Sequence, residues 1–267
     1  MAVWDCFIFY NELDILERRM HYLDSVVDHF VIVESSVTHK GTPKPSFYQD
    51  NKARYARWAD KIRHIVVDDN PEGDDASWAR ENHHRQGILR ALTDSAESSD
   101  WVMISDVDEI PNRGAVCLGR DNQIVNPTAF HMMAFQYSLD WMQTFEPWFG
   151  TVMCRWDQMP RGGPQELRNN RWKYPHHRFA GWHLSSFGSL DHVYNKLREY
   201  AHHADEPCVK TTRESLASDI AAGVLGGTHK LTPTPPVALN SMPRSLVEPL
   251  PLGTEEPQSA LVPGSAQ

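Results

Sequence analysis

A short apolar stretch that runs directly into three acids, WVMISDVDEIP at residues 101–111, decides how the chain is interpreted. Trp101 to Ile104 has the composition of a buried β-strand. Asp106 and Asp108 follow it and form the only Asp-x-Asp in the 267 residues. A solvated turn is one explanation of such a pair. Three acids at a strand end instead favour a site where both carboxylates bind one hard cation, Mg²⁺ or Mn²⁺, with positions left for diphosphate oxygens.

Strand and helix patterns alternate on either side of this stretch. Apolar runs at residues 3–10, 30–33 and 62–67 predict strands, and three- and four-residue apolar spacing predicts helices over residues 13–27 and 78–92. Such alternation is typical of a parallel sheet with crossover helices. In the second half, residues 128–139, 149–156 and 180–185 indicate further strands, residues 157–178 a long polar loop, and residues 190–201 a helix. We therefore predict an α/β fold with a central, mostly parallel sheet and a mixed C-terminal extension.

Charge and composition exclude several classes of protein. The 26 Lys and Arg residues stand against 35 Asp and Glu residues, a net charge of -9, so we expect no nucleic-acid partner and no anionic-lipid partner. No apolar stretch approaches the ~20 residues of a transmembrane helix. The four cysteines contain no C-x-x-C pair. These features predict a soluble, cytoplasmic protein with reduced thiols.

Other polar side chains also follow predicted strands, where open α/β sheets bind their ligands. Asn11 and Glu12 end the first strand and Glu34 ends the second, so they are candidates for a nucleoside pocket. Asn11 is equally well explained as a helix cap. Arg80 and Arg85 begin a helix that points toward the same edge and could neutralise a diphosphate, although pairing of Arg85 with the preceding Glu81 is a sufficient alternative.

His183, in the stretch GWHLS at residues 181–185, is the candidate from the second half. A neutral imidazole can complete a metal or diphosphate site, whereas a packed core histidine is the alternative. Its role depends on whether it meets Asp108 in the fold.

Six segments in the same order resemble glycosyltransferase family 17, over about residues 4 to 250. The resemblance implies a GT-A-like nucleotide-sugar-binding fold, inversion at the anomeric carbon, a divalent metal ion, and a nucleotide-sugar donor, which is UDP-GlcNAc in the animal enzyme. The segments are residues 4–19, 30–34, 38–41, 78–82, 106–111 and 181–185.

On this basis we expect a metal-dependent inverting glycosyltransferase that moves a sugar, from UDP-GlcNAc by resemblance, to a saccharide or other hydroxyl acceptor. Asp106, Asp108 and His183 would hold the metal ion. Inversion needs a general base, and the sequence alone does not choose among the carboxylates that follow the acidic stretch: Asp140, Glu146, Asp157, Glu166 and Asp191. Glu146, close to Trp148 and other aromatic residues that could stack on a sugar, is the first choice. A non-catalytic carbohydrate-binding protein and a Mg²⁺-dependent nucleotidyltransferase are the alternatives.

The organisation that follows is a single domain over residues 1–250. Its donor half covers about residues 1–112, its acceptor half about residues 113–230, and a segment at 231–250 wraps over the domain as irregular structure. Residues 251–267 combine Pro, Gly, Ser and Glu with little bulky apolar surface, so we expect a disordered tail.

Overall fold

The computed structural model describes residues 1–73, 76–201 and 204–248, and four parallel strands form the first half of its main sheet. Their order across the sheet is β3-β2-β1-β4. Side chains of β1 alternate between the two faces, since Phe7 and Phe9 belong to one core cluster and Trp4 and Cys6 to another. The bounds are β1 (Val3–Phe9), β2 (His29–Ser35), β3 (Ile62–Val67) and β4 (Trp101–Asp106).

The second half of the sheet is mixed. β7 (Trp141–Arg155) is antiparallel to β4, β6 (Thr128–Gln136) to β7, β9 (Gly181–Ser185) is parallel to β6, and β5 (Glu109–Pro111) is antiparallel to β9. Two short strands, β8 (His176–His177) and β12 (Thr232–Pro233), pair with β6 and β7. The predicted α/β fold with a mixed extension is therefore confirmed.

The sheet curls back on itself. β5 begins only three residues after the end of β4, yet it pairs with β9 at the other end of the strand order. The acidic turn between β4 and β5 therefore bridges the two halves of the sheet, and the Glu109–His183 pairing of β5 with β9 brings His183 toward that turn.

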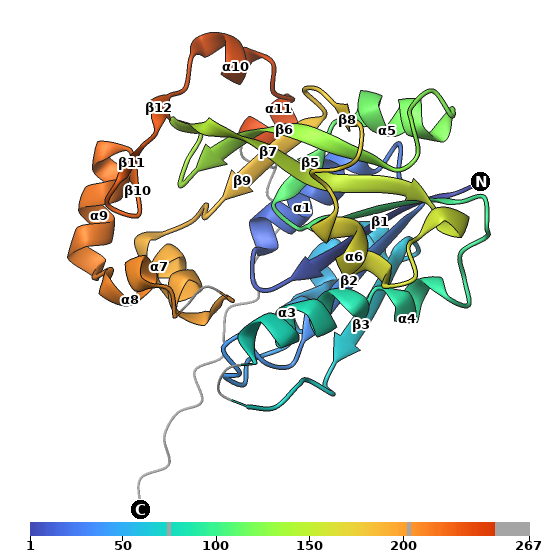
Figure 1. The fold of residues 1–267 in the computed structure, drawn as a ribbon, viewed down its shortest axis with the longest axis horizontal. Coiled ribbons are helices and arrows are strands. Elements are labelled where there is room, and N and C mark those ends of the chain that lie inside the picture. Colours follow the sequence, from blue (N-terminus) through green and yellow to red (C-terminus); the bar gives the residue numbers. More distant parts are fainter. Residues whose placement is uncertain (74–75, 202–203, 249–267) are drawn as a thin grey trace, which may run out of the picture.

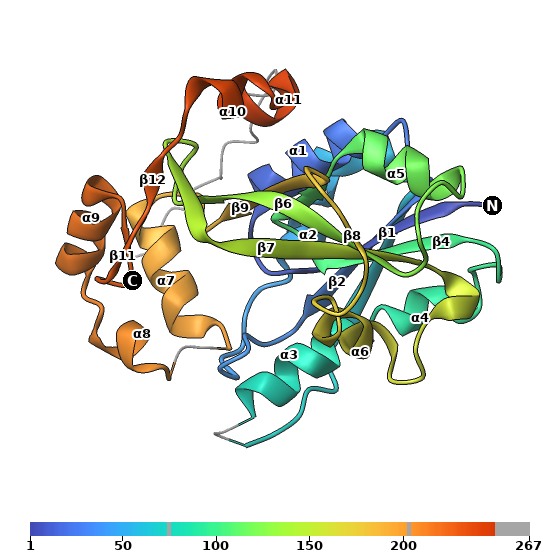
Figure 2. The same ribbon diagram turned by 45° about the horizontal axis from the view of Figure 1, so that its top comes forward.

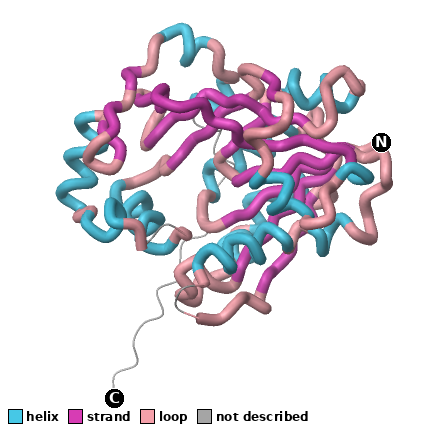
Figure 3. The backbone as a smooth tube through the Cα atoms, in the orientation of Figure 1, coloured by secondary structure: helices cyan, strands magenta, loops and turns pink. Residues whose placement is uncertain are grey.

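Helices cover both faces of the sheet, as Figures 1, 2 and 3 show. On one face α1 (Leu13–Leu23), α5 (Arg113–Arg120) and α11 (Arg244–Val247) pack around Phe7, Leu16 and Leu246. On the other face lie α3 (Ser77–Gln86), α4 (Leu89–Leu92) and α6 (Gly163–Asn169), around Val33 and Leu167. The short α2 (Phe47–Asp50) and the 3₁₀ helix Lys52–Trp58 pack on the first of these faces, and the 3₁₀ helix Trp156–Gln158 packs on the second.

A smaller cluster of helices lies beside the sheet, drawn in orange in Figure 1. It contains α7 (Leu190–Glu199), α8 (Glu206–Lys210) and α9 (Arg213–Ala222), followed by the hairpin β10 (Val224–Leu225) and β11 (His229–Lys230). Val193 and Leu216 form its apolar core with Tyr137 from the end of β6. Every helix in the described part of the chain is too short or too polar to cross a bilayer.

Three predicted elements differ in the structure. The helix predicted over residues 78–92 is two helices, because Ile88 and Arg90 donate to the carbonyl three residues before them instead of four. Gly87 between the two helices lies so close to the sheet that a Cβ there would come within 2.8 Å of Val33 and Val67. The predicted polar loop at 157–178 contains α6, which begins with Pro164 in its first turn and buries Leu167. The wrapping segment is not irregular throughout, since β12, α10 (Pro236–Asn240) and α11 lie within it. The predicted disordered tail lies outside the described residues.

Candidate active site

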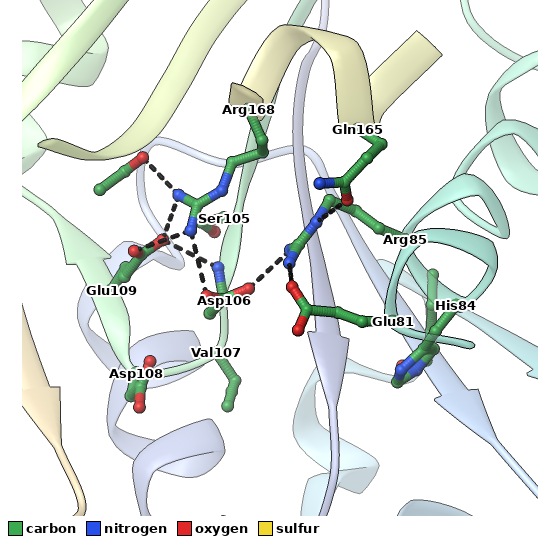
Figure 4. A network of polar contacts seen from close by, with 12 residues as sticks. Glu81, His84, Arg85, Ser105, Asp106, Val107, Asp108, Glu109, Gln165 and Arg168 are labelled. Carbon is green, nitrogen blue, oxygen red and sulfur yellow. Dashed lines mark hydrogen bonds and ion pairs between the residues drawn. The ribbon is translucent and has the colours of Figure 1, made fainter. Parts of the chain in front are cut away.

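A cavity of about 480 Å³ opens at the carboxyl ends of β1 and β4, a size typical of small-molecule sites. Its wall contains the acidic turn after β4 and side chains from α3 and α6, which Figure 4 shows from close by. His183 from β9 and Lys196 from α7 also line it. Residues from the whole length of the fold therefore meet at the edge of the parallel sheet.

Asp106 is held between two arginines from different helices. Nη1 of Arg85 on α3 donates to its Oδ1 over 2.6 Å, and Nη2 of Arg168 on α6 donates to its Oδ2 over 3.0 Å (Figure 4). Burial acts to raise the pKa of Asp106, but the charges of the two guanidinium groups hold it far below its ordinary value. Asp106 is therefore ionised, and each of its oxygens already accepts one charged hydrogen bond.

Glu109 lies fully buried behind Asp106 and fixes the geometry of the turn. Its two oxygens accept from Arg168 at 2.7 and 3.0 Å, from the Trp148 indole at 3.1 Å and from the Asp106 backbone N–H at 2.9 Å. These four hydrogen bonds, two of them from a guanidinium group, satisfy both carboxylate oxygens. Glu109 therefore positions Arg168 and Trp148 in the cavity wall and has no oxygen turned toward a ligand.

Asp108 and Glu12 share the ammonium group of Lys196. Nζ lies 3.0 Å from an oxygen of Glu12 and 3.2 Å from Oδ2 of Asp108. Burial acts to raise the pKa of both carboxyls, and the charge of Lys196 acts to lower it. At Glu12 the charge of Lys196 prevails and the pKa is lowered, whereas at Asp108 burial prevails and the pKa is raised. Burial acts to lower the pKa of Lys196, but the two carboxylates raise it well above its ordinary value. The cavity thus contains a carboxylate pair bridged by one cation.

His183 reaches the acidic turn. Its Nε2 lies 3.7 Å from Oδ1 of Asp108, and its ring stacks on Trp148 with the centroids 4.2 Å apart and an interplanar angle of 11°. Its buried Nδ1 forms no hydrogen bond with the described residues. The imidazole is therefore held by packing, with one nitrogen facing a carboxylate and the other unpaired.

The backbone of the turn rests on a buried arginine from α1. Arg19, with no exposed surface, donates from Nη1 to the carbonyl oxygens of Asp106, Val107 and Glu109 at 2.7–3.1 Å. Its Nε and Nη2 form a two-point contact with the buried Asp5 at 2.8 and 2.6 Å. Arg19 thus links the start of β1 to the turn that carries the acidic residues.

Arg171 contributes a different kind of positive charge. It follows α6 and lines the cavity, and among the described residues it forms no ion pair. Its buried Nε has no hydrogen-bond partner there, and Nη1 donates only to the carbonyl of Arg168. Burial, followed by the charge of Arg168, lowers the pKa of Arg171. Its guanidinium lies over the Trp172 ring at 5.3 Å, and the carboxylates of Glu109 and Asp106 act on it only from beyond ion-pair distance. A guanidinium without a direct ion pair in a cavity wall is suited to an anionic ligand.

The structure brings together five of the residues predicted for the site: the cavity is lined by Glu12, Arg85, Asp106, Asp108 and His183.

Four other predicted residues do not line this cavity. Glu34 is buried below it and accepts from Lys44, which does line it, at 3.1 Å. Arg80 donates to four backbone carbonyls, including those of His39 and Lys40, so it joins two loops. The Oδ1 of Asn11 is buried without a described partner, and the Asn11 side chain makes no cap hydrogen bond to α1. Glu146 lies in a neighbouring groove.

Four charged residues at or below the site, Arg19, Arg168, Arg171 and Lys196, were not assigned to it from the sequence. The spacing of Leu167 and Arg168 after Pro164 was a usable helix signal, but nothing in it showed which way the helix faces. Lys196 lies in a helix whose approach to the first half depends on the curl of the sheet. Only the fold supplies that information.

The sequence profile described as Glycosyltransferase family 17 matches residues 1–223. The chain belongs to glycosyltransferase family 17. The β-1,4-mannosyl-glycoprotein 4-β-N-acetylglucosaminyltransferases of mouse and human are both 28% identical to it over 220 residues, which cover 70% of this chain. The matched part is 40% of the mouse protein and 41% of the human protein, so the chain spans less than half the length of these relatives.

Solved structures of lower similarity also match this family 17 chain. HddC from Yersinia pseudotuberculosis, complexed with GMP-PN, is 10% identical with a TM-score of 0.37, covering 73% of this chain and 97% of that one. A putative nucleotide-diphospho-sugar transferase from Desulfovibrio desulfuricans G20 is 10% identical with a TM-score of 0.37, covering 83% and 96%. The parallel half and mixed extension of this sheet are the GT-A-like arrangement expected of the family.

Proposed function

We propose that this chain is a metal-dependent, inverting glycosyltransferase that transfers N-acetylglucosamine from UDP-GlcNAc to a hydroxyl group of a glycan. Membership of family 17 supports glycosyl transfer, and the names of the mammalian relatives support the N-acetylglucosaminyl group. The observation that carries the proposal is Arg171, which lines the cavity beside the acidic turn and forms no direct ion pair among the described residues, because a nucleotide diphosphate would supply such a partner.

The residues at the turn suit a divalent metal ion in their chemistry. No three His, Cys, Asp or Glu side chains among the described residues are arranged to hold a metal by themselves. Mg²⁺ in particular is commonly bound by one or two carboxylates together with substrate phosphates, so such a cage is not required. Asp108 and His183 would hold the ion, with Asp106 beside them. When bound, the ion would stabilise negative charge on the departing diphosphate.

The remaining roles fall to this chain's own side chains. In the transfer, the acceptor oxygen forms a bond to the anomeric carbon, the bond from that carbon to the diphosphate oxygen breaks, and UDP leaves. Arg171 and Lys196 would offset the charge that accumulates on UDP, and a carboxylate must take the proton of the acceptor hydroxyl. Glu146 stays the predicted general base; it lies in the groove that shares Trp148 with the cavity.

A panel of nucleotide sugars tests the reaction class. The chain is incubated with UDP-GlcNAc, UDP-glucose and GDP-mannose, with Mn²⁺ or EDTA, and with or without mannosyl oligosaccharides, and the released products are measured. UDP release from UDP-GlcNAc that requires Mn²⁺ and rises with acceptor is expected. Pyrophosphate release would instead indicate nucleotidyl transfer, and saccharide binding without turnover would indicate a carbohydrate-binding protein.

A matched pair of arginine variants tests the carrying observation. Arg171→Gln should weaken UDP binding about ten-fold or more, because a charged hydrogen bond contributes about 1.5–3 kcal/mol, and should leave the melting temperature unchanged or higher. Arg161→Gln, an exposed position in the same stretch, is the control. Calorimetric titration with UDP gives both affinities, and equal values would contradict the role of Arg171.

A further inference from the structure

A second hollow shares Trp148 with the donor cavity. It is an open groove of about 350 Å³ between residues 144–147 of β7 and Phe179 on the segment that leads into β9. Trp148 is fixed in position between the groove and the cavity, because its indole donates to buried Glu109 and its ring stacks on His183. A molecule in the groove would therefore touch the residue that forms a wall of the donor cavity.

The groove is made by a large bulge in β7. Met132 pairs with Trp148 and Ala134 pairs with Gln143, so a single residue of β6 faces four residues of β7. These four residues, 144–147, are all exposed, while residues 150–154 of the same strand are buried. Bulges are common beside active sites, where they redirect side chains. Here the bulge carries Phe145 and Glu146 out of the sheet.

Two aromatic side chains are exposed at the groove. Phe145 is 45% exposed and Phe179 is 72% exposed. Phe179 also has a φ of 54°, a left-handed backbone conformation that is costly for a bulky side chain. The ring of Phe145 contacts that of His229 on β11, with the centroids 5.1 Å apart, and the remainder of the Phe145 side chain is exposed. Exposed apolar surface and backbone strain are concentrated at sites that bind ligands.

The polar groups of the groove are suited to hydroxyls. Glu146 accepts from the amide of Gln143 over 3.3 Å, and both side chains line the groove. Aromatic faces beside a carboxylate and an amide match a sugar, whose ring has an apolar C–H face and a rim of hydroxyl groups. The carboxylate disfavours an anionic ligand, and a neutral one is therefore favoured.

We infer that this groove is the acceptor subsite and that it binds the terminal sugars of a neutral oligosaccharide against Phe145 and Phe179. The inference rests on the proposed function. It gives Glu146 a position from which to contact the acceptor hydroxyl, and it gives Trp148 the role of a shared wall between the two substrates.

Oligosaccharide binding measured without a donor tests this subsite. Mannotriose and chitotriose are titrated into the wild type, Phe145→Ala, Phe179→Ala and the exposed control Val237→Ala on α10, and UDP is titrated into each. Each Phe→Ala change should weaken binding of the bound saccharide about ten-fold, the Phe179→Tyr variant should keep the affinity, and Val237→Ala should match the wild type. UDP affinity should be the same in all five proteins, which also shows that each is folded.

The outcomes separate the two proposals. Two outcomes overturn the subsite alone. In the first, both Phe→Ala variants bind the saccharide with wild-type affinity. In the second, neither saccharide binds the wild type, although the wild type binds UDP and releases it from UDP-GlcNAc. Binding of an unglycosylated peptide that is lost in the same variants assigns the groove to a different ligand and also overturns it. A wild type that neither binds UDP nor turns over a nucleotide sugar overturns the proposed function itself.

Discussion

Replacing the buried Arg19 with methionine should lower both the free energy of unfolding and the rate of sugar transfer, because one side chain serves both. The change removes the counter-charge of Asp5, which has no exposed surface, and the three hydrogen bonds from Nη1 to the carbonyls of residues 106, 107 and 109. Of these carbonyls, only that of Glu109 keeps a described side-chain donor, Thr151 at 3.3 Å. Breaking a buried ion pair costs about 3–5 kcal/mol. For a chain of this size each kcal/mol lowers the melting temperature by about 2–4 °C, so we expect a fall on the order of 10 °C.

A double variant separates the ion pair from the turn. Asp5→Leu with Arg19→Met removes both charges, so most of the lost stability should return. Transfer should stay impaired, because the carbonyls of the acidic turn still lack the hydrogen bonds from Arg19. Urea unfolding and UDP release from UDP-GlcNAc are measured for both variants and for the neighbouring control Arg18→Met. An Arg19→Met protein as stable as the control, or a double variant with wild-type turnover, would refute the reasoning.

Four further changes have defined outcomes. Asp108→Asn should abolish UDP release while the melting temperature stays nearly constant, and full activity would contradict its role. His183→Ala should weaken Mn²⁺ binding in calorimetric titration; unchanged affinity with lower stability would make it a structural residue. Lys196→Met leaves Glu12 facing Asp108 without a cation, so Mn²⁺ should raise the melting temperature of this variant more than that of the wild type. Burial, with the charge of His39, holds the pKa of His84 well below its ordinary value, so the unfolded state takes up the proton first as the pH falls. The free energy of unfolding should therefore decrease below pH 6.5 by up to about 1.4 kcal/mol per pH unit. His84→Phe should reduce this slope.

The strands and the acidic turn were predictable because their signals are local. Buried strands such as Trp101–Asp106 are continuous apolar runs, and parallel strands place their carboxyl ends at one edge. The pairing of Glu109 with His183 was not contained in any local pattern. The only indication of this pairing in the sequence is the predicted mixed extension of the sheet, which would return the chain toward its first half.

The cationic half of the site could not be obtained from the sequence. Arg168 is one of several basic residues in a polar stretch, and its role comes from the contact of α6 with β4 and β7. The close approach of Gly87 to Val33 on β2 and Val67 on β3 is likewise a contact between segments that are far apart in the sequence. Arg19 looks like a surface charge by composition, yet it is fully buried in the fold, where it contacts the acidic turn from another element.

The bulge in β7 has a consequence for how this fold can vary. Residues 152–155 pair in register with β4, and residues 148–149 and 152–153 pair with β6 on the two sides of a smaller register shift. None of these pairs involves the segment between Gln143 and Trp148. Insertions or deletions at residues 144–147 would therefore reshape one groove and leave the acidic turn, its arginines and the curl of the sheet in place. The fold separates a part that can change length from a part that cannot. On the proposed assignment of the groove and the cavity, a change of acceptor would not require rebuilding the donor site.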